Sequence, residues 1–120
     1  NDFFVSSILI SKPNFITEKN ISGDLLFLDG KSKKNNLKNK IVVIENADPG
    51  FDWIFSYNIK GLITKFGGIN SHMSIRCEEL NIPAIIGFGE DNYSKITNLK
   101  QLNINCKLQK VNFGELKNND

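Results

Sequence analysis

The chain has 120 residues, of which 40% are hydrophobic and 23% are charged, and its formal net charge is +2. These values are typical of a globular domain with a single hydrophobic core, so we expect one domain over residues 1–120 rather than two. The nearly balanced charge argues against nucleic acid as a partner, and the apolar content argues against a disordered chain.

The first forty residues predict short β-strands separated by polar loops. Residues 5–10 and residues 24–28, which follow Gly23, are the apolar segments. Residues 30–40 form a hydrophilic connection in which lysines are interspersed with asparagines and no aromatic residue occurs. Such a segment is typical of a solvated loop, because a surface that stacks bases needs aromatic side chains.

The next segment changes from a strand pattern to a helix pattern. Residues 41–44 are an uninterrupted run of β-branched side chains, as in a strand buried on both faces. Asp48 followed by Pro49 predicts an N-cap and a first helical position. A helix to about residue 58, stopped by Gly61, is then predicted from the apolar spacing of Phe51, Ile54 and Phe55.

A second strand and a second helix follow. Residues 62–64 predict a short buried strand, after which the adjacent Gly67 and Gly68 predict a turn. Ser71 is a suitable N-cap for a helix over residues 72–80. The sequence therefore places a glycine-rich loop directly before a helix N-terminus.

The end of that helix and a third strand are also marked. Asn81 suits a left-handed position, and Pro83 cannot continue a helix. Residues 84–87 predict another buried strand, so that residues 41–87 alternate strand, helix, strand, helix, strand. Right-handed crossovers convert this order into a small parallel core sheet with packed helices, which is an α/β fold.

The residues that follow alternate more weakly between apolar and polar positions. They predict a short helix or turn and a closing strand, built on Ile96, Leu99, Leu102, Ile104 and Leu108. Residues 117–120 are expected to fray.

The sequence also bears on the environment of the protein. No apolar run reaches the ~18 residues of a membrane-spanning helix, and no signal-peptide pattern is present, so we expect a cytoplasmic protein with no membrane partner. Cys77 and Cys106 are isolated, which is typical of reduced thiols. Because His72 is the only histidine and structural zinc needs clustered His and Cys ligands, we expect no metal site.

The loop before the second helix holds the residues best suited to chemistry. Adjacent glycines at 67 and 68 leave the backbone uncovered, so that amides can approach an anion. The helix end that follows offers unpaired N–H groups to phosphate. His72 lies at that end, and its neutral imidazole is a nucleophile that phosphoryl transfer can use. These residues alone leave open whether His72 is a nucleophile or an ordinary surface histidine.

Other kinds of site find less support. The glycine pair lacks the Lys-Ser or Lys-Thr of a phosphate loop and the third glycine of a dinucleotide fingerprint. Ser71 beside His72 is not a catalytic triad, because adjacent residues rarely bring hydroxyl and imidazole together. Cys77 is expected to be a core thiol on an apolar face with Met73 and Leu80. Helix capping or exposure to solvent is expected of the nearby carboxylates, Asp48, Asp52, Glu78 and Glu79.

Three stretches of the sequence resemble a known signature. They are Gly61-Leu62-Ile63-Thr64, then Gly67-Gly68-Ile69-Asn70-Ser71-His72, and Glu79-Leu80-Asn81-Ile82-Pro83-Ala84-Ile85-Ile86-Gly87. Together they look like the signature of the swivelling phosphohistidine domain of phosphoenolpyruvate-utilising (PEP-utilising) enzymes. That family includes PEP synthase, pyruvate phosphate dikinase, rifampicin phosphotransferase, glutamine kinases and enzyme I of the sugar phosphotransferase system. Residues 41–55 fit the strand and helix that precede the signature in this family.

The resemblance implies a swivelling β/β/α domain whose catalytic residue is His72. In such enzymes the histidine takes a phosphoryl group, by way of a pyrophosphoryl group, from ATP bound with Mg²⁺ on a neighbouring ATP-grasp domain. The loaded domain delivers the phosphoryl group to a small acceptor on another domain, such as pyruvate or glutamine, with release of AMP and phosphate. By the same resemblance the domain itself binds no cofactor, and its phosphate-binding loop comprises Thr64, Gly67, Gly68, Asn70 and Ser71.

The chain departs from the family's usual residues at several positions. Alanine, alanine and arginine are replaced by Ser74, Cys77 and Glu78, and the only nearby arginine is Arg76. We expect an ATP-dependent synthase, dikinase or small-molecule kinase, because enzyme I carries a helical insertion for which this chain has no room. The alternatives are a PEP-dependent carrier like enzyme I and a non-catalytic interaction module. Since the chain begins at Asn1 and its only methionine is Met73, we expect it to be a segment of a larger multidomain enzyme.

Overall fold

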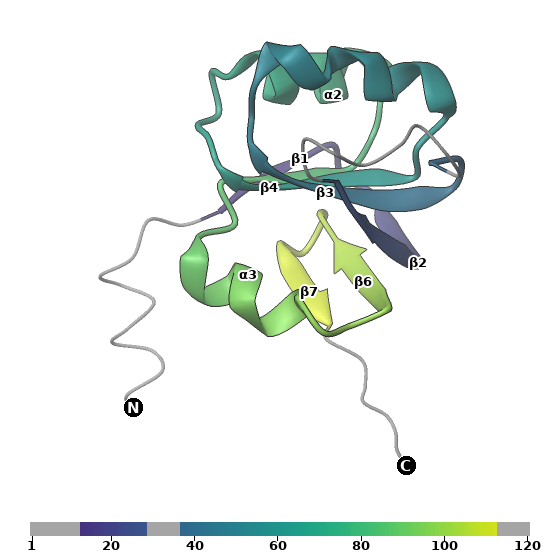
Figure 1. The fold of residues 1–120 in the computed structure, drawn as a ribbon, viewed down its shortest axis with the longest axis vertical. Coiled ribbons are helices and arrows are strands. Elements are labelled where there is room, and N and C mark those ends of the chain that lie inside the picture. The colour runs from purple at the N-terminus through teal and green to yellow at the C-terminus, as the bar shows by residue number, and fades with distance from the viewer. Residues whose placement is uncertain (1–12, 29–36, 113–120) are drawn as a thin grey trace.

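The computed structural model describes residues 13–28 and 37–112, which form a seven-stranded mixed sheet with helices on both faces (Figure 1). The expectation of an α/β fold is confirmed. The strands lie in the order β1-β5-β4-β3-β2-β6-β7. In chain order the elements are β1 (Asn14–Ile16), β2 (Asn20–Phe27), β3 (Lys40–Asn46), η1 (Pro49–Tyr57), β4 (Gly61–Phe66), α2 (His72–Leu80), β5 (Ala84–Ile86), α3 (Glu90–Ile96), β6 (Gln101–Asn105) and β7 (Lys110–Asn112).

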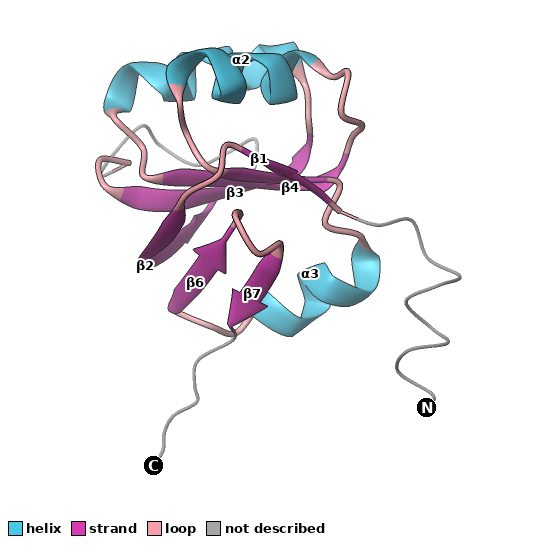
Figure 2. Cartoon of the chain, turned by 180° about the vertical axis from the view of Figure 1, so that it is seen from behind, coloured by secondary structure: helices cyan, strands magenta, loops and turns pink. Residues whose placement is uncertain are grey.

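The parallel unit predicted from the alternation of strands and helices is present at the centre of the sheet. Strands β3, β4 and β5 are parallel and adjacent, and β2 extends the parallel part on the other side of β3. Both connecting helices, η1 and α2, lie on the same face of the sheet (Figure 2). Successive right-handed crossovers that move in one direction along a sheet produce this arrangement.

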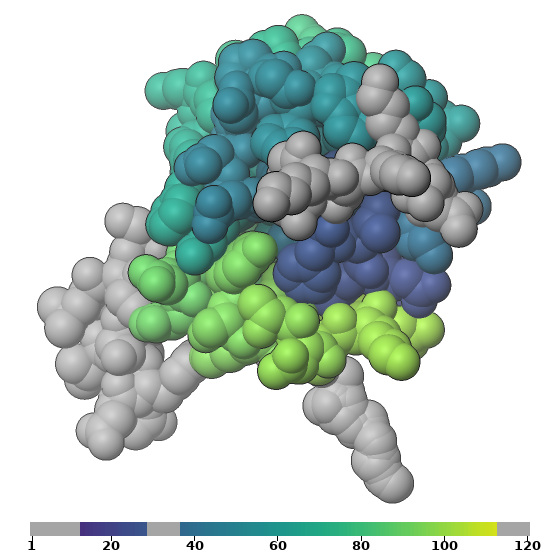
Figure 3. Space-filling view, viewed as in Figure 1, coloured from purple at the N-terminus to yellow at the C-terminus, as the bar shows by residue number. Residues whose placement is uncertain are grey.

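Antiparallel strands complete the sheet at both edges, and the sequence did not predict their pairing. Strand β1 pairs with β5, β6 pairs with β2, and β7 pairs with β6. In the space-filling view the β2 residues, coloured purple-blue, lie against the green and yellow residues of the C-terminal elements (Figure 3). The small parallel sheet is therefore the centre of a larger mixed one.

The core has two layers, one on each face of the sheet. Val42 and Ile44 of β3 pack toward η1 and α2, whereas Ile41 and Val43 pack toward α3 and β6. All four side chains are fully buried. The β-branched run is continuous because both faces of a strand at this position are covered.

Several element boundaries differ from those predicted. The first helix is a 3-10 helix that ends before Asn58, which has a left-handed φ of 55°, whereas Gly61 is the first residue of β4. Strand β5 ends at Ile86, because Gly87 has a φ of 77°. The predicted closing strand corresponds to β6, which β7 follows, and Leu108 lies in the turn between them with 60% of its surface exposed.

Three expectations lie outside the described residues: the strand over residues 5–10, most of the polar loop over residues 30–40, and the fraying of residues 117–120. Of the strand expected over residues 24–28, residues 24–27 belong to β2, which begins earlier, at Asn20, and ends at Phe27. Within the described ranges no helix has the length and apolar character needed to cross a membrane.

Candidate functional site

Helix α2 begins where the sequence predicts it, and His72 is its first residue. Ser71 is the N-cap, with an extended backbone and a side-chain Oγ that accepts a hydrogen bond from the Ser74 N–H at 3.3 Å. The other N–H groups of a first helical turn have no partner within the helix. At the other end, Asn81 adopts the left-handed conformation expected of it, with a φ of 63°.

The turn between β4 and α2 depends on Gly67. Its φ is 137°, and a Cβ at this position would lie 2.6 Å from the Cβ of Ala47, closer than van der Waals contact allows. The carbonyl of Gly67 also faces Gly87, where a Cβ would lie 2.5 Å from that oxygen. Gly67 thus lets the loop pass close to both the end of β3 and the end of β5.

The remaining loop residues leave the backbone open to solvent. Gly68 and Asn70 are exposed, and no atom lies within 4 Å of the place where a Cβ of Gly68 would be. The Gly68 carbonyl accepts a hydrogen bond from the Ser71 N–H at 3.0 Å, which closes a tight turn before the helix. Gly67, Gly68, Asn70 and Ser71 lie together next to His72, and their binding of phosphate stays a prediction.

Thr64 is placed differently from the other predicted loop residues. It is fully buried in β4, and its Oγ1 accepts a hydrogen bond from the Gly87 N–H at 3.0 Å. The hydroxyl fixes the turn after β5 to the strand that leads into the loop. In this conformation the Thr64 hydroxyl contacts the turn after β5 instead of the loop surface. A direct contact between this hydroxyl and a phosphoryl group stays a prediction.

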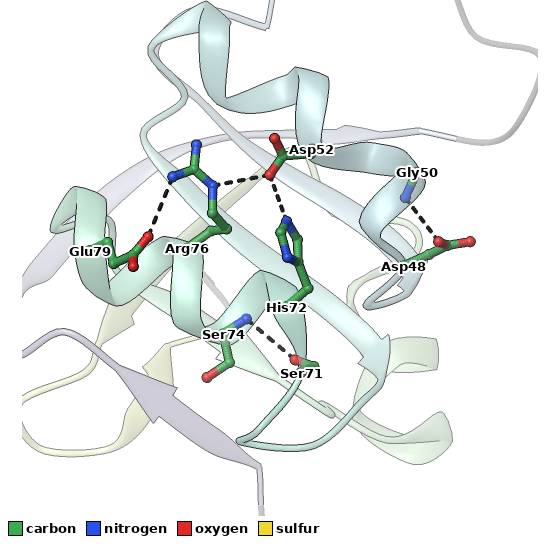
Figure 4. Close-up of polar contacts among 8 residues, drawn as sticks. All are labelled: Asp48, Gly50, Asp52, Ser71, His72, Ser74, Arg76 and Glu79. Atoms are coloured by element: carbon green, nitrogen blue, oxygen red, sulfur yellow. Dashed lines mark hydrogen bonds and ion pairs between the residues drawn. The ribbon is translucent and has the colours of Figure 1, made fainter.

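The imidazole of His72 contacts an acidic side chain from the other helix on the same face of the sheet. Its Nε2 lies 2.9 Å from Oδ1 of Asp52, which belongs to η1. The same oxygen accepts a hydrogen bond from Nε of Arg76 at 3.1 Å, one turn further along α2. Figure 4 shows both α2 side chains directed toward the Asp52 carboxylate. We call these three residues the Asp52 cluster.

The Asp52 cluster combines exposure with a fixed geometry. The side chains of His72 and Asp52 are 41% and 44% exposed, so the imidazole is accessible to a large reactant. Hydrogen bonds from His72 and Arg76 hold the pKa of Asp52 below its ordinary value of 3.8, and the carboxyl group is therefore ionised at neutral pH. An ionised carboxylate only accepts hydrogen bonds, so the proton in the contact between Asp52 and His72 is on Nε2.

Sequence reasoning assigned Asp52 to helix capping or solvent and did not connect it with His72. Asp52 lies in the first turn of η1, where a carboxylate is favoured by the helix dipole and carries no sign of a partner 20 residues away. Arg76 could have been found, because residues four apart lie on one face of a helix and Arg76 is the only arginine in the chain.

The other carboxylates near the site have separate contacts. Asp48 caps η1 as predicted, since its Oδ1 accepts a hydrogen bond from the Gly50 N–H at 2.9 Å. Oε1 of Glu79 accepts a hydrogen bond from Nη1 of Arg76 at 3.4 Å. Glu78 is exposed, as expected of a residue on the solvent side of α2.

The cysteine of α2 belongs to the core. Cys77 is fully buried, as predicted, and desolvation raises the pKa of its thiol to about 12. Met73 is also buried, but Leu80 is not a core residue, because 42% of its surface is exposed. The expectation that Leu80 shares the buried face is therefore wrong: the buried residues of α2 are Met73, Ser74 and Cys77, and Leu80 is its exposed last residue.

Exposed apolar side chains occur on the same loop and helix as His72. Phe66, Ile69 and Ile75 are 45%, 57% and 49% exposed. Phe66 and Ile69 flank the glycine pair, and Ile75 follows His72 by three residues on the outer face of α2. Exposed apolar side chains near a site are candidates for contact with another protein surface.

The described part of the chain contains no group of three or more His, Cys, Asp or Glu side chains that could hold a metal ion. The chemistry that the site offers by itself is that of an accessible imidazole beside a carboxylate and a guanidinium.

Comparison with known proteins gives one result for the chain as a whole. The family model described as "PEP-utilising enzyme, mobile domain" matches residues 37–108. The match extends from the residues before β3 to those after β6 and includes the loop, His72 and the Asp52 cluster. No protein in a search of curated sequences matched the chain.

Proposed function

The chain belongs to the PEP-utilising enzyme mobile-domain family, and from this membership we propose that it is a phosphohistidine carrier domain of a phosphotransferase, with His72 as the residue that is phosphorylated. The observation that carries the proposal is the position of the chain's one histidine. His72 is the first residue of α2, follows the glycine-containing loop directly, and is 41% exposed. A carrier needs an accessible nucleophile on a rigid body, and this site provides both.

The proposed donor is ATP bound with Mg²⁺ on a neighbouring ATP-grasp domain. A nitrogen of His72 attacks the β-phosphorus, the bond from that phosphorus to the oxygen shared with the α-phosphate breaks, and AMP leaves with the electron pair. Water then attacks the terminal phosphorus, the bond from that phosphorus to the bridging oxygen breaks, and inorganic phosphate departs, leaving a phosphoryl group on His72. An amide-lined loop next to a helix N-terminus stabilises the negative charge that collects there.

The proposed acceptor is a small molecule on another domain of the same enzyme, such as pyruvate or a metabolite like glutamine. We favour a small-molecule kinase over a pyruvate enzyme because of the departures from the family's usual residues at Ser74, Cys77 and Glu78. The exposed side chains of Phe66, Ile69 and Ile75 suit transient docking against the two partner domains, because each partner must cover the same face in turn.

The test uses the full-length protein that contains this chain, incubated with Mg²⁺ and ATP labelled at the β position. We expect acid-labile, base-stable label on the peptide that contains His72, and none in the His72→Ala variant, with Asp91→Asn as a control that keeps the label. Asp91 lies in the first turn of α3, which packs on the other face of the sheet from η1 and α2.

The other outcomes discriminate between the alternatives. Label that comes from PEP but not from ATP would move the protein to the enzyme I type of carrier. No label from either donor would contradict the carrier proposal and leave the non-catalytic interaction module.

A further inference from the structure

The chain's only arginine lies beside its only histidine, and one carboxylate oxygen joins them. Oδ1 of Asp52 lies 2.9 Å from Nε2 of His72 and 3.1 Å from Nε of Arg76. An anionic oxygen thus occupies the space between the nucleophilic ring and the guanidinium. Any anion attached to Nε2 would enter this same space.

The guanidinium keeps two other contacts that do not depend on Asp52. It lies over the ring of Phe55, with its central carbon 5.5 Å from the ring centroid. Nη1 lies 3.4 Å from Oε1 of Glu79. These two contacts keep Arg76 beside the His72 imidazole even when Asp52 moves. The Nε–H of Arg76 then remains directed at the position that Oδ1 of Asp52 fills.

We propose that Arg76 binds the phosphoryl group of loaded His72 and that Asp52 holds the position of that group in the unloaded domain. This inference rests on the proposed function, because it assigns a residue to the phosphorylated state. An oxygen of a phosphoryl group on Nε2 takes the place of Oδ1 and accepts the Nε–H of Arg76. Guanidinium groups bind phosphoryl oxygens with strong, charge-assisted hydrogen bonds.

The exchange follows from charge. Asp52 is ionised, because its contacts with His72 and Arg76 lower its pKa. A carboxylate and a phosphoryl group are both anionic, so they repel each other when both lie between Nε2 of His72 and Nε of Arg76. Loading therefore displaces the carboxylate while Arg76 stays, so that the guanidinium changes partner from Asp52 to the phosphoryl group.

Nε2 must lose its proton before it can bond to phosphorus. When Asp52 releases the ring, the proton on Nε2 is exchanged through water for one on Nδ1, which gives the other neutral tautomer. The lone pair of Nε2 then forms the N–P bond. The bond from phosphorus to the donor's leaving atom breaks, and its electron pair leaves with that atom.

The chain's composition makes the test direct. Because there is one histidine and one arginine, labelling these two amino acids with ¹⁵N gives a single imidazole and a single guanidinium signal set. The 120-residue chain is loaded with phosphoramidate, which transfers its phosphoryl group to imidazole and releases ammonia, and is followed by ¹⁵N and ³¹P NMR. The variants are Arg76→Gln and the conservative Arg76→Lys, with Lys107→Gln as a charge-matched control at an exposed turn.

We expect phosphorylation on Nε2, a shift of the Arg76 Nε–H signal on loading, and loss of the hydrogen bond between Asp52 and His72. The lifetime of the phosphohistidine should fall about threefold in Arg76→Gln, the order expected for one partly exposed charge-assisted hydrogen bond, and recover in part in Arg76→Lys. Lys107→Gln should match the wild type.

Three results would overturn the inference: an Arg76 signal that does not move on loading, a phosphoryl group on Nδ1 with the contact between Asp52 and Nε2 retained, or no loading of the folded wild-type chain. The wild-type spectra decide the matter even if Arg76→Gln fails to fold. Phosphoramidate needs no partner domain, so these results are independent of whether the full-length protein accepts label from ATP.

Discussion

The Nε2 of His72 lies 2.9 Å from Oδ1 of Asp52, although 20 residues separate them in the chain. Two helices on the same face of the sheet bring them together, since His72 begins α2 and Asp52 lies in the first turn of η1. The contact fixes one nitrogen of the ring and leaves the imidazole exposed. Through this hydrogen bond the fold orients the imidazole of the proposed nucleophile.

The first prediction concerns the pH dependence of this contact. Hydrogen bonds to His72 and Arg76 lower the pKa of Asp52 below 3.8, so the folded state binds its proton less readily than the unfolded state does. The stabilisation is therefore complete above about pH 4 and is lost as the pH falls through the lowered pKa. The difference in unfolding free energy between wild type and Asp52→Asn should be present at pH 5 and shrink as the pH falls below 4. A difference that grew toward low pH would contradict the assigned direction.

The second prediction compares the two loop glycines. Gly67→Ala should destabilise the fold by about 1–3 kcal/mol, because its φ of 137° and its closeness to Ala47 leave no strain-free place for a Cβ. Gly68→Ala should change stability by less than about 1 kcal/mol, since the space beside it is open. Urea denaturation of both variants measures this, and equal losses would show that the loop has another conformation.

The third prediction concerns the cap of α2. Ser71→Ala should cost about 1 kcal/mol of unfolding free energy, because the Ser74 N–H loses its side-chain acceptor. Ser71→Asp is the matched control, since a carboxylate oxygen can accept the same hydrogen bond, and it should recover most of the loss. If Ser71→Asp were as unstable as Ser71→Ala, the side chain of Ser71 would have a role other than capping.

The fourth prediction concerns the two cysteines. Burial raises the pKa of the thiol to about 12 in Cys77 and about 11 in Cys106, so neither forms a thiolate at pH 8. A disulfide reagent such as dithionitrobenzoate should react with the native chain slowly and with both thiols at once in urea. Rapid reaction of one thiol in the native chain would show a local opening at that residue.

The fifth prediction concerns the apolar side chains around His72. Ile69→Ser and Ile75→Ser should reduce phosphoryl transfer in the full-length protein, because both side chains are about half exposed and belong to the proposed docking contact near His72. Their reaction with phosphoramidate should be unchanged, since that reagent needs no docking. Leu108→Ser, at an exposed position after β6, should leave both rates unchanged. Slower loading with phosphoramidate would show that the substitutions disturb His72 itself.

The sequence by itself determined the parts of this protein that depend on neighbours in the chain. The buried run over residues 41–44, the cap at Ser71, and the left-handed Asn81 are local features, and each was predicted correctly. Alternation of strand and helix was enough to give the parallel centre of the sheet, because crossover handedness is nearly invariant. The glycines and His72 were found together because they are adjacent in the sequence.

Only the tertiary structure decided which distant residues share the site. Asp52 looked like any acidic residue in a first helical turn, and its partner on α2 became visible once the sheet had placed η1 and α2 side by side. Thr64 appeared available to the loop, but the turn after β5 uses its hydroxyl. Hydrogen bonds between elements depend on the distance and orientation of two separately placed backbones. A local sequence pattern contains neither quantity, so the carboxylate of Asp52 beside His72 had to come from the fold, whereas Arg76, four residues from His72 on the same helix, needed only the helix itself.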